Sequence, residues 1–285
     1  IINTVSGMNL ISRIIVDGFL NGLNHSRRVG YGMEFSQYRA YESGDDLRLL
    51  DWKMLARSGR YYIKQSEIET HISIKFILDA SQSMAHKEES LSKFDLAKIS
   101  IASLAYLAQN QGDAVGLFAL NDQKIHSVYP KVQKQHFNRL LLELLNVDEK
   151  GQWPIKDALP LLQQKTSKEL LFFVTDLYEY DEELTGFIKT LKTKRNEVVV
   201  LHLMSDKELT FDYSGTLTFE DLETQQRVKV DTKDVKDTYL KVLNENLSSV
   251  KNLFLNQGIH YHQFNLNDPI HETLHTFLKT RRNLL

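Results

Sequence analysis

The stretch Ile72 to Met84, which reads ISIKFILDASQSM, constrains the fold of this chain more than any other. Its apolar run, with three isoleucines, predicts a buried strand that ends at Asp79. Ser81 and Ser83 follow at alternate positions, so three oxygen-bearing side chains come directly after the strand. In an open α/β sheet, ligands bind in the crevice beyond the carboxyl ends of the strands. We therefore expect a binding site here, and its oxygens suit a hard divalent cation such as Mg²⁺ or Mn²⁺.

From His71 onwards, patterns typical of helices and strands alternate, which predicts a doubly wound, mostly parallel α/β sheet. The apolar run Leu170 to Thr175 has the composition of a fully buried strand, and Asp176 follows it directly. We expect Asp176 to lie at the same edge of the sheet as Asp79. Residues 209–231 instead alternate apolar and polar side chains around a polar connection, which predicts a β-hairpin inserted into the parallel core.

The organisation predicted from these patterns has two parts. Residues 1–70 are expected to form an N-terminal helical and extended subdomain, and residues 71–285 the α/β domain with its hairpin insert. An amphipathic helix around Asn9 to Leu20 is expected to pack on the domain that follows it. Charged and polar residues interrupt this apolar segment well short of a membrane-spanning length, so no membrane span is predicted.

Charge and cysteine content restrict the classes of function. The formal net charge is −2 at pH 7, whereas a nucleic-acid-binding domain is normally clearly basic. The chain has no cysteine, so a disulfide framework, a thiolate zinc site and a cysteine nucleophile are all excluded. The lack of cysteine fits a reducing compartment, and we predict a cytoplasmic location.

A block rich in charged and aromatic residues precedes the first strand of the α/β domain. Three of its aspartates and three of its arginines carry matched opposite charges, and arginine pairs bidentately with carboxylate. The residues concerned are Arg39, Asp45, Asp46, Arg48, Asp51, Trp52 and Arg57. Two interpretations remain open: a salt-bridged clasp that docks the subdomain on the α/β domain with Trp52 as its apolar anchor, or a surface that faces a partner protein.

The sequence Asp79-x-Ser81-x-Ser83, with Asp176 after a later strand, resembles the metal-ion-dependent adhesion site of von Willebrand factor A domains. The resemblance implies that these four residues contact Mg²⁺ or Mn²⁺, directly or through water, and that a partner carboxylate completes the coordination. The threonine ligand of that family is absent, because the corresponding loop, residues 151–154, reads GQWP. An alternative without metal also remains open, in which both serines cap the following backbone and Asp79 accepts local amide hydrogen bonds.

The N-terminal block closely resembles the bacterial domain-of-unknown-function family 58 (DUF58), and the resemblance extends over essentially the whole chain. The motifs that carry it are Gly32-x-Glu34-Phe35, Arg39-x-Tyr41, Gly44-Asp45-Asp46-x-Arg48, Asp51-Trp52-Lys53, Ala56-Arg57 and Tyr62-Ile63-Lys64. The resemblance implies a von Willebrand A-like, Rossmann-like fold and a non-enzymatic protein-interaction module. Members typically lie beside genes for MoxR-type AAA+ ATPases and other von Willebrand A proteins, so partners of these kinds are expected, in the assembly or activation of protein complexes.

A metal-dependent hydrolase is the competing function, either at the Asp79 site or at the sequence His271-Glu272-x-x-His275. This sequence matches the H-E-x-x-H helix of zinc proteases, in which the glutamate is the general base. Chance matches to so short a motif are expected. A phosphatase of the D-x-D type is not favoured, because Ser81 stands where the second aspartate would act as general acid.

Overall fold

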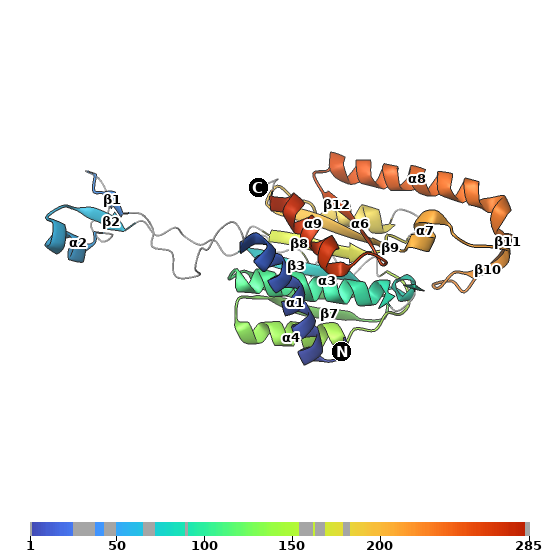
Figure 1. Cartoon of the computed structure of the whole chain (residues 1–285), viewed down its shortest axis with the longest axis horizontal. Helices are drawn as coiled ribbons and strands as arrows, with labels where there is room; N and C mark the ends of the chain where they lie inside the picture. The colour runs from blue at the N-terminus through green and yellow to red at the C-terminus, as the bar shows by residue number, and fades with distance from the viewer. Residues whose placement is uncertain are drawn as a thin grey trace. The chain divides into compact units, whose positions relative to one another are not determined.

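The computed structural model describes residues 2–24, 38–42, 50–64, 72–88, 91–153, 162, 169–178 and 183–282 (Figure 1). The chain divides into two compact units. The main unit comprises Ile1–Gly22 and Ile72–Leu285, and the second unit comprises Leu23–His71.

A six-stranded sheet with the order β12-β9-β8-β3-β6-β7 forms the centre of the main unit. Its strands are β3 (Ser73–Asp79), β6 (Ala114–Leu120), β7 (Ile125–Lys131), β8 (Glu169–Thr175), β9 (Asn196–Met204) and β12 (His260–Asn265). Only the β6–β7 pair within this sheet is antiparallel. Counted along the chain, the strand order is 3-2-1-4-5-6, that of doubly wound folds. The predicted fold class is confirmed.

Side chains alternate between the two faces of the sheet, and each face has its own core. In β3, Phe76 and Leu78 belong to one core cluster and Ile77 to the other. The first cluster is covered by α3 (Lys93–Asn110), α4 (Lys134–Leu145) and α9 (Ile270–Arg282). The second is covered by α6 (Glu183–Leu191) and by the C-terminal part of α8 (Thr232–Asn256). The helices on both faces leave the carboxyl edge of the strands as the place where a site can form.

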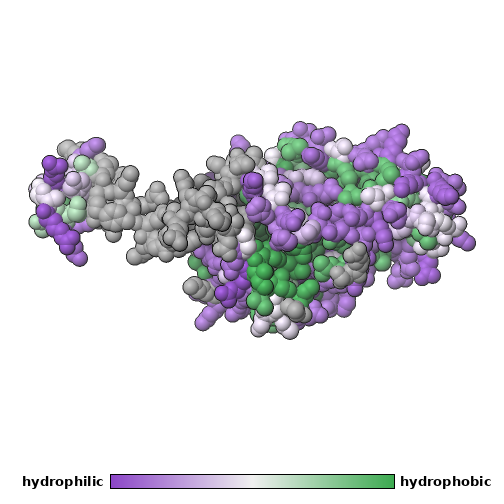
Figure 2. All heavy atoms as spheres, in the orientation of Figure 1, coloured by the Kyte–Doolittle hydropathy of each residue, from purple (hydrophilic) through white to green (hydrophobic). Residues whose placement is uncertain are grey.

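Helix α1 (Val5–Asn24) belongs to the main unit, although the predicted boundary places it in the N-terminal subdomain. Met8 is fully buried in the first core cluster, and Ile11 and Ile15 pack against that cluster. The outer side of the helix is also apolar, since Leu10 and Ile14 are 56% and 63% exposed. Figure 2 shows apolar side chains gathered over α1. The amphipathic helix expected around Asn9 to Leu20 is thus present and packs on the α/β domain.

The second unit contains a small antiparallel sheet and one short helix in its described part. Strands β1 (Tyr38–Ala40) and β2 (Tyr62–Lys64) pair with each other. Helix α2 (Trp52–Ser58) begins after Asp51, whose carboxylate accepts hydrogen bonds from the amides of Lys53 and Met54. Such a cap satisfies backbone donors that have no partner within the helix.

The predicted insert forms a separate two-stranded sheet beside α8. Strand β10 (Thr216–Glu220) pairs antiparallel with β11 (Arg227–Asp231). A short helix, α7 (Asp206–Thr210), leads into this hairpin. Two short strands, β4 (Lys87–Glu88) and β5 (Leu91–Ser92), and the 3₁₀ turn η2 (Gln82–Ala85) lie between β3 and α3. Of the helices described, none combines the length and apolar character needed to cross a membrane.

Candidate functional site

The two predicted aspartates meet at the carboxyl edge of the sheet, because β3 and β8 are parallel neighbours. Both aspartates are almost fully buried. One carboxylate oxygen of Asp79, Oδ1, accepts a hydrogen bond from the amide of Ser81 at 3.0 Å, and Oδ2 accepts one from the hydroxyl of Thr175 at 2.7 Å. Asp79 is therefore held from both segments that form the site.

The two predicted serines connect Asp79 to Asp176. The hydroxyl oxygens of Ser81 and Ser83 lie 3.0 Å apart, and the Ser83 hydroxyl donates to Oδ1 of Asp176 at 3.3 Å. Ser81 is the N-cap residue of η2, but its side chain makes no capping hydrogen bond. The capping role considered as an alternative therefore does not account for Ser81, whose hydroxyl faces the other site oxygens.

A buried lysine that the sequence analysis did not identify pairs with Asp176. The Nζ atom of Lys93 lies 3.1 Å from Oδ2 of Asp176 and 2.6 Å from Oε1 of Glu208, and its side chain is 5% exposed. Burial favours the neutral amine, but the attraction of the two carboxylates outweighs this effect and raises the pKa of Lys93. Lys93 is thus an ammonium ion that neutralises one side of the site.

His202 supports the backbone of Asp176 from the next strand, β9. Its Nε2 lies 2.9 Å from the carbonyl oxygen of Asp176, and its Nδ1 lies 2.6 Å from the hydroxyl of Tyr261 on β12. Burial lowers the pKa of His202 to about 4, and the charge of Lys93 adds to this effect. The imidazole is therefore neutral at physiological pH, so Nε2–H donates to the carbonyl and Nδ1 accepts from the tyrosine.

Negative charge is in excess on the serine side of the site. Burial, followed by the charge of Asp176, raises the pKa of Asp79 to about 6. Glu223, on the connection between β10 and β11, hydrogen-bonds to Ser83. Burial raises the pKa of Glu223 to about 7, with the charges of Asp79 and Asp176 among the further causes. A cation at this position would favour the ionised form of Asp79 and Glu223 and so lower both pKa values.

The hairpin is tied to the loop that follows β8. The hydroxyl of Tyr178 donates to Oδ2 of Asp221 at 2.8 Å, and Oδ1 of Asp221 accepts the amide hydrogen bonds of Glu223 and Thr224. Tyr178 also donates its own amide to Oδ1 of Asp176. The inserted hairpin is thereby connected to the site through two residues of one short loop.

The donor set fits a hard divalent cation. Asp79, Ser81, Ser83 and Asp176 offer carboxylate and hydroxyl oxygens, the ligands that Mg²⁺ and Mn²⁺ prefer. The ammonium group of Lys93 donates to Oδ2 of Asp176, whereas Oδ1 of Asp176 accepts the hydrogen bond of Ser83. Among the described residues, no three His, Cys, Asp or Glu side chains are grouped so that they could hold a metal ion. Metal binding at this site would therefore depend on the serine hydroxyls.

The loop in which the threonine of the adhesion-site pattern is absent lies beside the site, but its tryptophan packs in the core. Its backbone borders the site, because the amide of Gln82 donates to the carbonyl of Gly151 at 2.9 Å. The ring of Trp153 lies with its centroid 5.3 Å from those of Phe173 and Phe187, in the second core cluster. The tryptophan therefore contributes to packing, and this loop adds no hydroxyl to the donor set.

The predicted residues of the N-terminal block are only partly within the described chain. Asp45, Asp46 and Arg48 lie outside it. Asp51 caps α2, as described above, and Arg57 lies in the last turn of the same helix. Trp52 is 64% exposed, and Arg39 belongs to β1. The choice between a clasp and a partner-facing surface stays a prediction.

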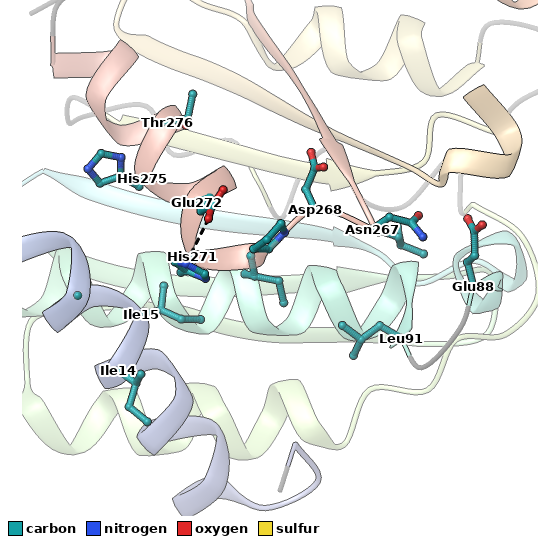
Figure 3. A pocket seen from close by; sticks show the side chains of 14 residues that line it. Ile14, Ile15, Glu88, Leu91, Asn267, Asp268, His271, Glu272, His275 and Thr276 are labelled. Atoms are coloured by element: carbon teal, nitrogen blue, oxygen red, sulfur yellow. Dashed lines mark ion pairs between the residues drawn. The ribbon is translucent and has the colours of Figure 1, made fainter. Parts of the chain in front are cut away.

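The H-E-x-x-H sequence lies in the first turns of α9, at a pocket of about 1000 Å³ beside α1 (Figure 3). Nε2 of His271 lies 3.7 Å from Oε1 of Glu272, and the two side chains are 67% and 71% exposed. His275 lines the same pocket. The described histidines and carboxylates form no metal-binding group here or elsewhere. The zinc-hydrolase alternative gains no support from this geometry.

Three charged residues of the site were missed at the level of sequence: Lys93, Glu208 and Glu223. A local signal existed for the lysine alone, since it is the first residue of α3 after the N-cap Ser92. A positive charge is unfavourable at a helix N-terminus, so a lysine there indicates an anion close by. The two glutamates reach the site only through the tertiary arrangement of α7 and the hairpin.

The sheet order and its single antiparallel edge pair define a doubly wound, mostly parallel α/β protein, as predicted. A family model described as "Protein of unknown function DUF58" matches residues 37–246, which is more than half of the chain. The chain therefore belongs to the DUF58 family.

Several known proteins are similar to this chain. Uncharacterized proteins of Mycobacterium tuberculosis and Mycobacterium bovis are 27% identical over 126 residues, a match that spans 44% of this chain and only 40% of each relative. The structure of the conserved hypothetical protein BatB from Bacteroides thetaiotaomicron shares 12% identity, with a TM-score of 0.48 over 74% of this chain and 99% of that one. A von Willebrand factor type A structure from Catenulispora acidiphila shares 12% identity, with a TM-score of 0.41 over 73% of this chain and 42% of that one.

Proposed function

We propose that the chain is a cytoplasmic, non-enzymatic protein-interaction module that recognises its partner at the edge of the sheet around Asp79 and Asp176. The main support is the convergence of four hard oxygen donors from two segments that are far apart in the sequence. Ser81 and Ser83 connect the two aspartates through contacts of 3.0 and 3.3 Å. This edge is also where ligands bind in doubly wound sheets.

Mg²⁺ or Mn²⁺ is the proposed cofactor, held by Asp79, Ser81, Ser83 and Asp176. When bound, the cation would supply a positive charge to which a carboxylate of the partner could bind. One hard ligand of the adhesion-site pattern is missing, and Lys93 already neutralises part of the charge of Asp176. Both features argue for weak metal binding.

The proposed partner is a MoxR-type AAA+ ATPase, together with other von Willebrand A proteins, in the assembly or activation of protein complexes. Membership in the DUF58 family supports this proposal. The charged block of the second unit is a further candidate contact. Its Trp52 is 64% exposed, so a large apolar side chain is accessible to a partner there. A hydrolytic function finds less support. At the first candidate site Lys93 pairs with Asp176, one of the proposed metal ligands, and at the second the side chains of His271 and Glu272 are largely exposed.

Affinity capture tests this proposal. Tagged wild-type protein and the Asp79→Asn variant are each used as bait, with Mg²⁺ and Mn²⁺ present or removed by a chelator, and captured proteins are identified by mass spectrometry. We expect an AAA+ ATPase with the wild type in the presence of metal and much less of it in the other three conditions. The reason is that the variant loses one of the two carboxylates that hold the cation.

A matched control is Asp113→Asn, because Asp113 directly precedes β6 at the opposite edge of the sheet, where it accepts the amide hydrogen bond of Ile72. This variant should capture the same proteins as the wild type. Identical partner lists in all four conditions would rule out recognition through the metal. Partner lists without an AAA+ ATPase would rule out the proposed partner.

A further inference from the structure

Helix α8 is long but barely buried. Of its 25 residues, only Thr232 and Phe254 are buried. Its apolar side chains nevertheless recur at helical spacing along one side, at positions 235, 239, 242, 243, 247 and 250. The C-terminal part of this stripe packs on the second core cluster through Val250, Leu253 and Phe254. The N-terminal part lies against the hairpin and the segment around α7 and Phe211.

The hairpin leaves this N-terminal part of the stripe incompletely covered. No residue of β10 or β11 is buried. Between the hairpin and the helix lies a cavity of about 1010 Å³. We call it the hairpin groove, and its apolar walls are formed by Leu222, Val228 and Val230 from the hairpin and by Val235, Val242 and Leu243 from α8. Figure 1 shows α8 and the two strands extending past the end of the central sheet.

Apolar side chains in the hairpin groove are open to solvent. Val228 and Val242 are 59% and 57% exposed, and Leu222 is 40% exposed. Exposed apolar side chains that gather along one groove indicate an interaction site, whereas isolated ones do not. A partner that covers these side chains would therefore gain the free energy of burying them.

Aromatic packing fixes the floor of the groove. The ring of Phe211 lies 4.6 Å from that of Tyr239 on α8 and 5.8 Å from that of Phe219 on β10, measured between centroids. The hydroxyl of Tyr239 also donates to the carbonyl of Glu208 at 3.0 Å. The two walls are thus joined by rigid side chains, so the groove is formed before a partner binds and little ordering is needed on association.

The charges that line the groove are mainly negative. Five carboxylates contribute, those of Asp176, Glu208, Glu220, Asp221 and Asp234. The ammonium groups among the lining residues are those of Lys93 and Lys207, and Lys93 is buried in its pairs with Asp176 and Glu208. Glu220 is paired with Arg227 at 2.9 Å, and Lys207 is exposed, so a cationic group of a ligand would be directed to Asp221 and Asp234.

We propose that the hairpin groove binds a segment of a partner protein that combines apolar side chains with lysine or arginine, the apolar side chains contacting α8 and the hairpin and the basic side chain reaching Asp221 or Asp234. This inference rests on the proposed function as a protein-interaction module and names the chemistry of its partner. It requires neither the cation nor an AAA+ ATPase. The groove is continuous with the candidate site, since Ser83 and Asp176 also line it.

The test is selection of peptides from a random display library on the full-length protein. We expect enriched peptides to carry apolar residues together with lysine or arginine, and to bind in a fluorescence anisotropy titration. Val242→Asp should weaken this binding by about tenfold or more, as for a central contact of an interface. Higher salt should weaken it as well, because the basic side chain faces carboxylates.

The matched control is Leu255→Asp, which places the same charge on the same helix at a position that is 55% exposed and outside the groove lining. This variant should bind the selected peptides as the wild type does, and equal melting temperatures of the two variants would show that both are folded. Removal of Mg²⁺ and Mn²⁺ by a chelator should leave peptide binding unchanged, which separates this inference from the proposed metal-dependent capture.

Four results would overturn the inference. The enriched peptides could be acidic, or they could bind Val242→Asp and Leu255→Asp equally well. It is also possible that no peptide is enriched on the wild type over Val242→Asp. A monomer–dimer equilibrium that Val242→Asp abolishes and Leu255→Asp does not, measured by sedimentation, would assign the groove to a second copy of this chain and would also overturn it.

Discussion

His202 links the candidate site to the edge of the sheet through both of its ring nitrogens. Nε2–H donates to the carbonyl of Asp176, and Nδ1 accepts from the hydroxyl of Tyr261. Protonation would convert Nδ1 from acceptor to donor and would place a second cation near Lys93 in a buried environment. The neutral form is thus part of the folded structure, and folding must depend on pH through this residue.

The residue-scale prediction is that His202→Gln removes part of the acid sensitivity of the protein. The pKa of His202 falls from 6.5 to about 4 on folding, so between these values the unfolded chain takes up a proton that the native chain does not. Stability is therefore lost as pH falls from 6.5 towards 4, by at most about 3 kcal/mol from this residue. Urea denaturation at a series of pH values should show a shallower loss in the variant.

The groups that face His202, namely Lys93, Asp176 and Glu208, are present in both proteins, so the difference between the two pH profiles isolates the histidine. An overall loss of stability in the variant shifts its profile without changing this comparison. Parallel profiles between pH 6.5 and 4 would contradict the prediction.

Residues next to strand ends were predictable from the sequence, and those brought in by tertiary structure were not. Asp79 and Asp176 directly end or follow buried apolar runs, so their meeting at one edge of the sheet follows from the parallel fold. Glu208 and Glu223 lie in segments without a chemical motif. The loop without the threonine has a packing role that only the structure shows, because the ring of Trp153 contacts those of Phe173 and Phe187.

At the scale of elements, α1 combines a structural face with an exposed apolar face. Its amphipathic pattern predicted a helix packed on the following domain, and the structure shows this packing. The pattern could not predict that apolar residues would also occupy the outer side. The alternation of apolar and polar residues predicted the hairpin. That the hairpin forms a sheet separate from the central one depends on its tertiary arrangement, which the alternation does not contain.

The element-scale prediction contrasts two apolar residues of α1. Met8→Ala removes a fully buried side chain from the first core cluster. It should lower the free energy of unfolding by about 2–5 kcal/mol, the sum of lost burial and the cavity left behind. Leu10→Ala, at a position 56% exposed, should change it by about 0.5 kcal/mol or less. Chemical denaturation of the full-length variants measures both.

Equal effects of these two substitutions would show that α1 does not contribute its inner face to the core. A large effect of Leu10→Ala alone would indicate that the outer face is covered in solution, for example by another protein molecule. Because both changes leave alanine, a strong helix former, differences in helix propensity cannot account for the contrast.

At the scale of the whole molecule, the described core belongs to one unit. Every member of the two core clusters lies within residues 1–22 or 72–285. The second unit has its own small sheet, its own capped helix and a buried Leu50. The sequence predicted an N-terminal part with a distinct character and a helix within it that packs on the main unit, as α1 does.

The whole-molecule prediction is that the main unit folds without the second unit. Replacing residues 23–71 with a flexible Gly/Ser linker should leave the far-ultraviolet circular dichroism of an α/β protein and shift the melting temperature by no more than about 4 °C, since no core residue is removed and one loop replaces another. Partner capture should fall if the charged block with Trp52 faces the partner. A much larger loss of stability would instead favour the clasp, because removing a salt-bridged, apolar anchor exposes the surface that it covered. The same deletion thus decides between the two interpretations of the block, with circular dichroism and capture as separate measurements.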